Sequence, residues 1–440
     1  MRRLARLAFS LSVVGVVGCA DGGDFDDTSL PCPPTQYSCD ITDEACAAGV
    51  LDLTACIRGD DVPELPKINR LTAREFGEQL RVEAEEDDNG PSPWDPVLVA
   101  LGLLPAGKGL VEASIAEAVD SVAAFYDSET KEVSIITDAG SEDADARERM
   151  YLLSHEFTHL LQDRAHDLEK LSDEASSSTD RRLSLSMLVE GEAVVTSTRA
   201  LLRLVRRSPD DFNFPNFFDT LDESLLEGVG QASAPLAAAL QSMPYNVGGR
   251  YVAKLGERSG WDAVKKLYDT TPPTAADWLA LDTAHPGDSR AEPLDCAPPL
   301  PPDGFELYDL DHFGAAGVLA MLASIDKTEL ELPGELAADA FALYVEQGDT
   351  DPARARVIGV WRLRFRSAAA SDRFYKLFEK RDIGLRRVGS ELLIRVSSGS
   401  ASTLLQDSEL EACPSLEELD PKHPTGSQPN PVRKITRLWH

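Results

Sequence analysis

The sequence contains no apolar run long enough to span a membrane as a mature helix, because such a helix needs about 20 apolar residues. Its one marked apolar stretch, Leu7–Gly18, is too short for that. Basic residues are also scarce: 43 Lys and Arg stand against 75 Asp and Glu, and the formal net charge is −32. A field of this sign repels nucleic acid and anionic lipid. We therefore expect no nucleic-acid partner.

The N-terminus has the features of an export signal. Three arginines stand among the first six residues, directly before Leu7–Gly18, an order typical of signal peptides. The stretch ends in Val-Val-Gly-Cys, which resembles the lipobox of bacterial lipoproteins, where the cysteine is lipidated and becomes the mature N-terminus. The resemblance implies a signal peptide at 1–18, lipidation of Cys19, and an extracytoplasmic protein held at a bacterial membrane by lipid. An ordinary cleaved signal with an unrelated cysteine is the alternative.

Cysteine usage agrees with export. The chain has 7 cysteines, and lipidation of Cys19 would leave an even number for disulfides in an oxidising compartment. Four of them lie within 32–56, which predicts two local bridges, although four cysteines allow three pairings. No CxxC pair is present, which disfavours a metal cluster. The remaining cysteines are Cys32, Cys39, Cys46 and Cys56, expected to pair locally, and Cys296 and Cys413, expected to form a long-range bridge.

The composition divides the chain into five segments. After the signal peptide, a segment rich in Asp, Gly, Pro and Cys predicts a tether with a small disulfide-stapled module. A mostly helical body follows, and then a smaller unit in which strand patterns flank one helix. The last segment is too polar and proline-rich to build a core, which predicts a flexible tail. We expect an α+β fold with segments 1–18, 19–62, 63–336, 337–413 and 414–440.

Several elements of the body follow from local patterns. Apolar periodicity predicts helices over 71–86 and 98–120. The stretch 121–137 alternates β-forming residues on both sides of Asp-Ser-Glu-Thr, which predicts a hairpin. Asp145, with Glu148 three residues later, matches the capping box that begins many helices. We expect that next helix to carry one apolar stripe.

The same helix contains the motif HEFTH, in which His155 and His159 are four residues apart. Residues at this spacing share one helix face, so both imidazoles can bind one Zn²⁺ ion. Glu156, next to the first histidine, can reach a water molecule at the metal without binding the metal itself. It would take the proton of that water and pass it to the leaving amine. A polar patch on a packed helix is the alternative.

A catalytic zinc needs a third protein ligand. His166 follows His159 by seven residues with no glycine between them, whereas the metzincin motif HExxHxxGxxH needs six and a glycine, so a metzincin is disfavoured. A further helix, predicted from about Leu183, offers Glu190 and Glu192. Their segment, LVEGEA, resembles the glutamate-bearing helix of gluzincins. The resemblance implies that Glu190, the glutamate before the glycine, is the third ligand and that Glu192 is not.

The order of the motifs resembles that of a family of poorly characterised bacterial HExxH proteins, many of them lipoproteins. An FYD hairpin, HExxHxxQD, LVEGEA and a G-W…PP pattern occur in this order between 121 and 290. The resemblance implies a zincin-like fold, peptidase activity and a hairpin edge that binds an extended peptide substrate. The sequence departs from the pattern after Thr274. The ligand spacing is longer than in thermolysin-like enzymes because of 172–182, which predicts an exposed loop.

Peptide hydrolysis also needs a group that stabilises negative charge on the scissile carbonyl. Tyr245 is the first candidate, because it begins the segment YNVGGR, whose glycines allow close backbone approach. His285 and His312 are the other candidates. Gln162 and Asp163 could orient the metal ligands from behind, and a helix-surface role is equally compatible with the sequence.

The leading hypothesis is a lipid-anchored, extracytoplasmic zinc metallopeptidase of gluzincin type that hydrolyses peptides or proteins with Glu156 as general base. A surface-tethered binding or assembly lipoprotein with a non-catalytic zincin fold is the alternative. Zinc-dependent hydrolysis of a non-peptide amide, such as cell-wall material, ranks third because no sugar-binding pattern is evident.

Overall fold

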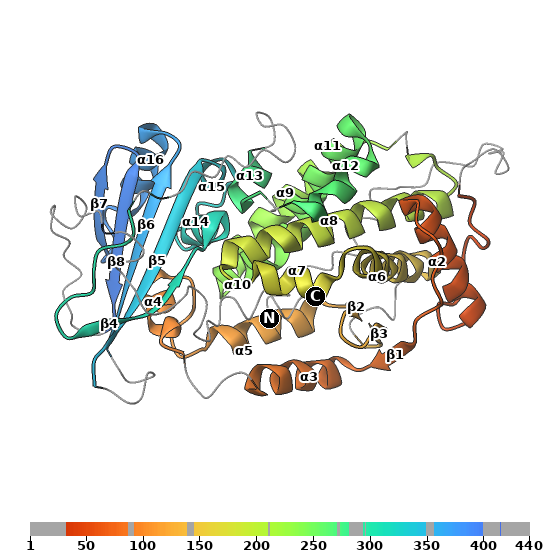
Figure 1. Ribbon diagram of the computed structural model, residues 1–440, viewed down its shortest axis with the longest axis horizontal. Helices are drawn as coiled ribbons and strands as arrows, with labels where there is room; N and C mark the ends of the chain where they lie inside the picture. The colour runs from red at the N-terminus through yellow and green to blue at the C-terminus, as the bar shows by residue number, and fades with distance from the viewer. Residues whose placement is uncertain are drawn as a thin grey trace.

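The structure is a computed structural model whose fold is α+β with two sheets, as the sequence predicts in that general form (Figure 1). Cys19, His285 and Cys413 lie outside the described residues, as do the expected signal peptide and nearly all of the expected tail. In the part of the chain that is described, no helix is both long and apolar enough to cross a membrane. The described residues are 32–86, 92–138, 145–209, 212–270, 273–280, 294, 296–348, 356–398 and 414.

Helices form the body, and the larger sheet lies at one end of it (Figure 1). The α-helices are α2 (Glu44–Arg58), α3 (Ala73–Glu86), α4 (Trp94–Leu101), α5 (Leu110–Ser121), α6 (Ala146–His166), α7 (Leu168–Ala175), α8 (Thr179–Leu204), α9 (Phe214–Gln231), α10 (Pro235–Met243), α11 (Gly249–Ser259), α12 (Trp261–Lys265), α13 (Ala275–Leu279), α14 (Gly314–Ala323), α15 (Glu331–Gly334) and α16 (Ala368–Phe378). A π-helical turn η4 (Pro244–Gly248) joins α10 to α11, and a 3₁₀ turn η5 (Lys266–Asp269) follows α12. The strands are β1 (Ile68–Leu71), β2 (Ala124–Asp127), β3 (Glu132–Ile136), β4 (Phe305–Asp311), β5 (Leu336–Glu346), β6 (Val357–Phe365), β7 (Gly384–Val388) and β8 (Glu391–Ser397).

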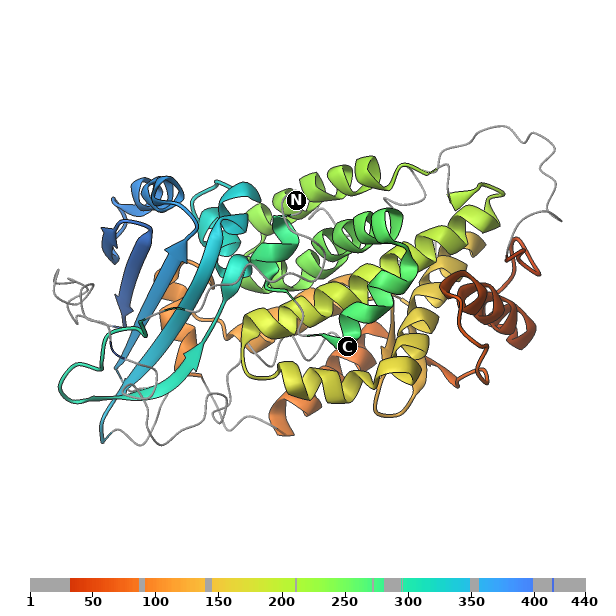
Figure 2. The same ribbon diagram turned by 45° about the horizontal axis from the view of Figure 1, so that its top comes forward.

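The cysteine-rich segment folds around α2 and packs on the end of the body away from the larger sheet (Figure 2). Two local disulfides staple it, as predicted, and the structure selects the pairs Cys32–Cys56 and Cys39–Cys46. Val50 and Leu53 of α2 share a hydrophobic core with Phe157 and other residues of α6 and α8. Cys296 is also disulfide-bonded. Its pairing with Cys413 stays a prediction, because Cys413 is outside the described residues.

The expected hairpin is present as β2 and β3, and it belongs to a small sheet of order β1-β3-β2. β3 pairs with β1 in parallel and with β2 antiparallel. β2 is therefore an edge strand of this sheet, and it lies against α6. Tyr126 and Val133, which face each other across the hairpin, are both buried.

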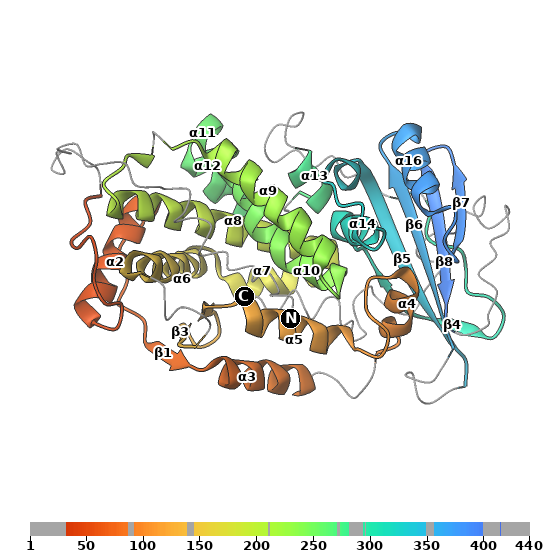
Figure 3. The ribbon, with the colours of Figure 1, turned by 180° about the vertical axis from the view of Figure 1, so that it is seen from behind.

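The two central helices, α6 and α8, begin at well-formed caps. Asp145 caps α6 in a complete capping box with Glu148, as predicted. Ser178 caps α8, its hydroxyl accepting the backbone N–H of Arg181. Seen from behind, α9, α10 and α11 lie in front of part of α8 (Figure 3); α11 packs directly on α8, and α9 packs on α11. The two helices thus run side by side in the interior, where few of their side chains reach solvent.

The prediction of an exposed loop over 172–182 is wrong. α7 ends at Ala175 and α8 begins at Thr179, so only a short turn separates two helices. Thr179 and Asp180 are buried. Serine-rich stretches suit helix caps as well as loops, because a hydroxyl can accept the free N–H groups of a first helical turn. Here Ser178 caps α8, and the sequence alone does not distinguish a helix cap from a loop.

The larger sheet has the order β4-β5-β6-β8-β7, with antiparallel pairing throughout. The strand and helix patterns expected after residue 337 are all present, and β4 joins them from an earlier part of the chain. Trp94 of α4 packs against Phe341 of β5 with the two rings tilted, and Phe313 contacts both Phe341 and Trp361 of β6. One hydrophobic core therefore extends from the sheet into the helical body.

Candidate metal centre

Two histidines of α6 and one glutamate of α8 converge in the interior of the body. His155 Nε2 lies 3.0 Å from Glu190 Oε2, and His159 Nε2 lies 3.5 Å from the same oxygen. Within the described residues this is the one group of its kind in which three potential ligand atoms lie within 4.8 Å of one another. His155, His159 and Glu190 could therefore hold a metal ion. Glu192, the rejected candidate, is absent from the group.

The three buried side chains interact strongly through charge. Burial disfavours the charged form of His159, but the carboxylate of Glu190 outweighs burial and raises the pKa of His159 to about 9. Burial also disfavours the carboxylate form of Glu190, and the two histidines outweigh it, so the pKa of Glu190 falls well below its usual range. A buried carboxylate is thus held ionised by positive charge. Two imidazoles and one carboxylate are the donor set of many catalytic zinc sites.

Glu156 lies between the two histidines on α6 and is 4 % exposed. Burial raises the pKa of Glu156, and the charges of His155 and His159 partly oppose that rise. The backbone N–H of Tyr126 in β2 also lowers the pKa of this carboxyl group slightly. The candidate base is therefore buried beside the candidate ligands, on the helix that packs against the edge strand.

Tyr245 is the one candidate oxyanion stabiliser that the structure places at this group. Its side chain hydrogen-bonds to Glu190, and its ring centroid lies 6.0 Å from that of His155. Tyr245 belongs to η4, and π-helical turns of this kind are frequent at functional sites. Close helix contact makes the placement possible: a Cβ on Gly191 of α8 would lie 2.4 Å from the carbonyl carbon of Gly248.

A network of buried polar side chains contacts His159 on the side of its ring away from Glu190. His159 Nδ1 lies 2.9 Å from Gln162 Oε1, and the Gln162 amide donates to Glu192 Oε2 at 3.0 Å. Glu192 also accepts hydrogen bonds from Arg58 (3.0 Å) and Tyr268 (2.7 Å). Sequence reasoning proposed Gln162 as an orienting residue but missed Arg58 and Tyr268. Their distance along the chain explains the omission, because no local pattern links them to the histidine helix.

The remaining candidates lie elsewhere. Asp163 accepts hydrogen bonds from Tyr126 Oη and Lys131 Nζ, so it ties α6 to the hairpin rather than to the ligands. His166 stacks on Tyr268 at a centroid distance of 4.2 Å. His312 Nδ1 bonds to the backbone carbonyl of Asp339, next to the larger sheet. None of these three belongs to the group of candidate ligands.

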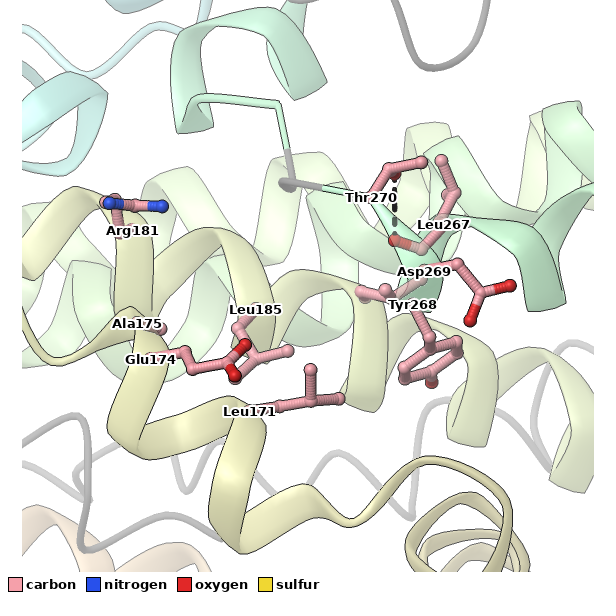
Figure 4. Close-up of a pocket in the computed structure, with 10 residues that line it drawn as sticks. Leu171, Glu174, Ala175, Arg181, Leu185, Leu267, Tyr268, Asp269 and Thr270 are labelled. Atoms are coloured by element: carbon pink, nitrogen blue, oxygen red, sulfur yellow. Dashed lines mark hydrogen bonds between the residues drawn. The ribbon is translucent and has the colours of Figure 1, made fainter.

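A cavity of about 240 Å³ opens between α7, α8 and η5, beside the polar network that contacts His159 (Figure 4). Leucines make most of its apolar wall, and Glu174, Arg181 and Asp269 supply charge. None of the three candidate ligands lines it. Tyr268 connects the two features, because its ring lines the cavity while its hydroxyl donates to Glu192.

Comparison of the chain with family models, with curated proteins and with solved structures finds no match. The likeness of its motifs to gluzincins therefore rests on the short segments named above.

Proposed function

We propose that this chain is a zinc-dependent metallopeptidase of the gluzincin type. The observation that carries the proposal is the convergence of His155, His159 and Glu190 on one point, with Glu156 buried beside them. A purely structural zinc site is closed by four protein ligands, whereas a catalytic one has three and an open position. The group has three, and a structural site would have no use for a carboxylate in the position of Glu156.

The residues divide the chemistry of peptide hydrolysis between them. A zinc ion held by the three ligands would polarise the scissile carbonyl and lower the pKa of the attacking water. Glu156 accepts the proton of that water and delivers it to the leaving nitrogen, and a carboxylate whose pKa burial has raised is the stronger base. Tyr245 has one hydroxyl hydrogen, which bonds to Glu190 in this structure; with substrate bound, it would be donated instead to the oxygen on which negative charge develops.

The edge strand β2 offers a place for an extended substrate. The Ile136 N–H donates to the Ala123 carbonyl, so residues 123 and 136 pair through hydrogen bonds. Because such pairs alternate along an antiparallel ladder, the N–H of Tyr126 points away from β3. This N–H influences the Glu156 carboxyl group, and so the outer edge of β2 adjoins the candidate base. A peptide added to this edge would lie across Glu156.

We place the protein outside the cytoplasm, held at a bacterial membrane by a lipid on Cys19. Two disulfides and the lack of a membrane-crossing helix in the described residues are compatible with this location. The anchor itself follows from the lipobox-like sequence. Mass spectrometry of the N-terminal peptide from membranes tests it: an acylated Cys19 supports the anchor, and an unmodified or internal Cys19 contradicts it.

The experiment for the activity compares wild type with Glu156→Gln on a mixture of peptides at neutral pH, with zinc measured in both proteins. We expect Glu156→Gln to keep its zinc and to lose nearly all hydrolysis, because an amide cannot accept the proton. Equal hydrolysis by both proteins would disprove the role of Glu156. Zinc binding without hydrolysis in wild type would favour the alternative of a binding lipoprotein.

A further inference from the structure

We propose that the disulfide-stapled N-terminal segment is a working part of the metal centre, and that Arg58 and Glu192 are positioning residues that set the orientation of His159 through Gln162. The inference rests on the proposed zinc site and adds to it. It gives the segment 19–62 a role in orienting a metal ligand, whereas the sequence predicts only a tether with a small disulfide-stapled module.

The path from the segment to the ligand is a continuous chain of hydrogen bonds. Arg58 donates to Glu192, Glu192 accepts from Gln162, and Gln162 lies 2.9 Å from His159 Nδ1. A histidine that binds zinc through Nε2 carries its proton on Nδ1, which then donates to the Gln162 carbonyl. Gln162 is held in that orientation because its amide donates to both Glu192 and the carbonyl of Val189.

Burial makes this network sensitive to the loss of any member. The side chains of Arg58 and Glu192 are 1 % and 6 % exposed. Arg58 contacts both carboxylate oxygens of Glu192: its Nε donates to Oε1 at 3.0 Å, and its Nη2 donates to Oε2 at 3.4 Å. Removing one partner of such a pair leaves a buried charge without compensation. Arg58 therefore holds the Glu192 carboxylate in place against the Gln162 amide, which bonds to the same oxygen, Oε2.

The stapled segment holds Arg58 in place from two sides. Arg58 is the last residue of α2, two residues after Cys56, whose disulfide to Cys32 closes the segment. One turn earlier, Thr54 Oγ1 lies 2.8 Å from Ser154 Oγ, and Ser154 directly precedes His155 on α6. α2 thus contacts α8 at Glu192 and α6 beside the first candidate ligand.

The test measures zinc affinity by chelator competition and the visible spectrum of the cobalt(II)-substituted protein. The variants are Glu192→Gln, which keeps the shape of the side chain, Gln162→Leu, which replaces the amide by an apolar group, and Tyr268→Phe, which removes a single hydrogen bond to Glu192. Arg366→Met is the matched control, because it breaks another buried ion pair, Arg366 with Asp277 (15 % and 3 % exposed). Thermal unfolding is recorded for each protein.

We expect Glu192→Gln and Gln162→Leu to weaken zinc binding about 10- to 100-fold, the usual effect of losing an outer hydrogen-bond partner. Both should also change the cobalt spectrum, and Tyr268→Phe should do so to a smaller extent. Arg366→Met should lower stability while leaving affinity and spectrum unchanged. Wild-type affinity and spectrum in Glu192→Gln and Tyr268→Phe would overturn the inference and leave the zinc site standing, whereas a wild type that binds no metal would overturn both.

Discussion

At the scale of single residues, Tyr245 shows how the surroundings of a side chain define its chemistry. Burial, together with the charges of Glu190 and Glu156, raises the pKa of Tyr245 well above its usual value. The phenol therefore keeps its proton throughout the neutral range and has a hydrogen to donate there. A fixed donor beside a metal ligand suits the stabilisation of an oxyanion.

We predict that Tyr245→Phe lowers kcat about 10²- to 10³-fold with little change in zinc content, because one donor to the developing oxyanion is lost. Steady-state kinetics on a cleaved peptide, with zinc measured in parallel, provide the check. Unchanged kcat would remove Tyr245 from the catalytic residues. Loss of zinc would instead assign it to holding Glu190.

The candidate ligands could be predicted from short sequence motifs, and the residues that hydrogen-bond to them through Gln162 and Glu192 could not. HEFTH is local, because one helical turn brings His155 and His159 together whatever surrounds the helix. Glu190 was chosen from a short likeness, and the structure places it, rather than Glu192, with the histidines. The bond from Arg58 to Glu192 joins positions 134 residues apart. Such a contact depends on how whole elements pack.

At the scale of elements, the crossing of α8 with η4 and α11 sets the distance between Glu190 and Tyr245. Gly191 contacts the backbone of Gly248 and Gly249 so closely that a Cβ at this position would lie 2.4 to 2.8 Å from their atoms. Glycine is required there because helix backbones touch directly. The Gly in LVEGEA thus has a packing role next to the ligand.

We predict that Gly191→Ala destabilises the fold by about 1–3 kcal/mol, since the two backbones must separate to admit a methyl group. Gly230→Ala in α9 is the control, because its Cβ would meet only a Thr328 methyl at 3.2 Å and a helical alanine is favoured over glycine by about 1 kcal/mol. Urea unfolding measures both. A stable Gly191→Ala would contradict the tight crossing.

Elements with a local signal were predicted well. The capping box of Asp145 and Glu148 and the β2–β3 hairpin each depend on a few neighbouring residues, and both are present. The stretch 98–120 is divided between α4 and α5 where Gly102 ends α4 in the left-handed conformation. The prediction of a loop over 172–182 is wrong because Ser178 is equally compatible with a loop and with a helix cap. The pairing of β4 with β5 could not be predicted from local patterns, since the two strands are separated along the chain.

At the scale of the whole molecule, a cluster of buried carboxylates joins the helical body to the larger sheet. Asp180 of α8 accepts the Ala275 N–H, and Asp339 of β5 accepts the N–H groups of Phe313 and Trp361 Nε1. Burial and the nearby charge of Asp339 raise the pKa of Asp180 to about 8. Asp180 is therefore protonated in the folded protein at neutral pH.

This protonation makes stability depend on pH. The unfolded chain releases the Asp180 proton near pH 3.8, and the folded protein keeps it to about pH 8. Between these values the folded state binds more protons, so this group makes stability fall as pH rises, by at most about 1.4 kcal/mol per pH unit. We predict that Asp180→Asn removes this slope and gains stability relative to wild type from pH 5 to pH 8. Urea unfolding at several pH values would contradict this if the difference between the two proteins stayed constant.

The most direct test of the metallopeptidase proposal is the zinc content of the purified protein, measured by elemental mass spectrometry after incubation with zinc and dialysis, for wild type and Glu190→Ala. We predict about one zinc per wild-type chain and its loss in Glu190→Ala, because two histidines alone hold zinc weakly. A wild-type protein that takes up no zinc would contradict the assignment of His155, His159 and Glu190 as ligands, and the proposed activity with it.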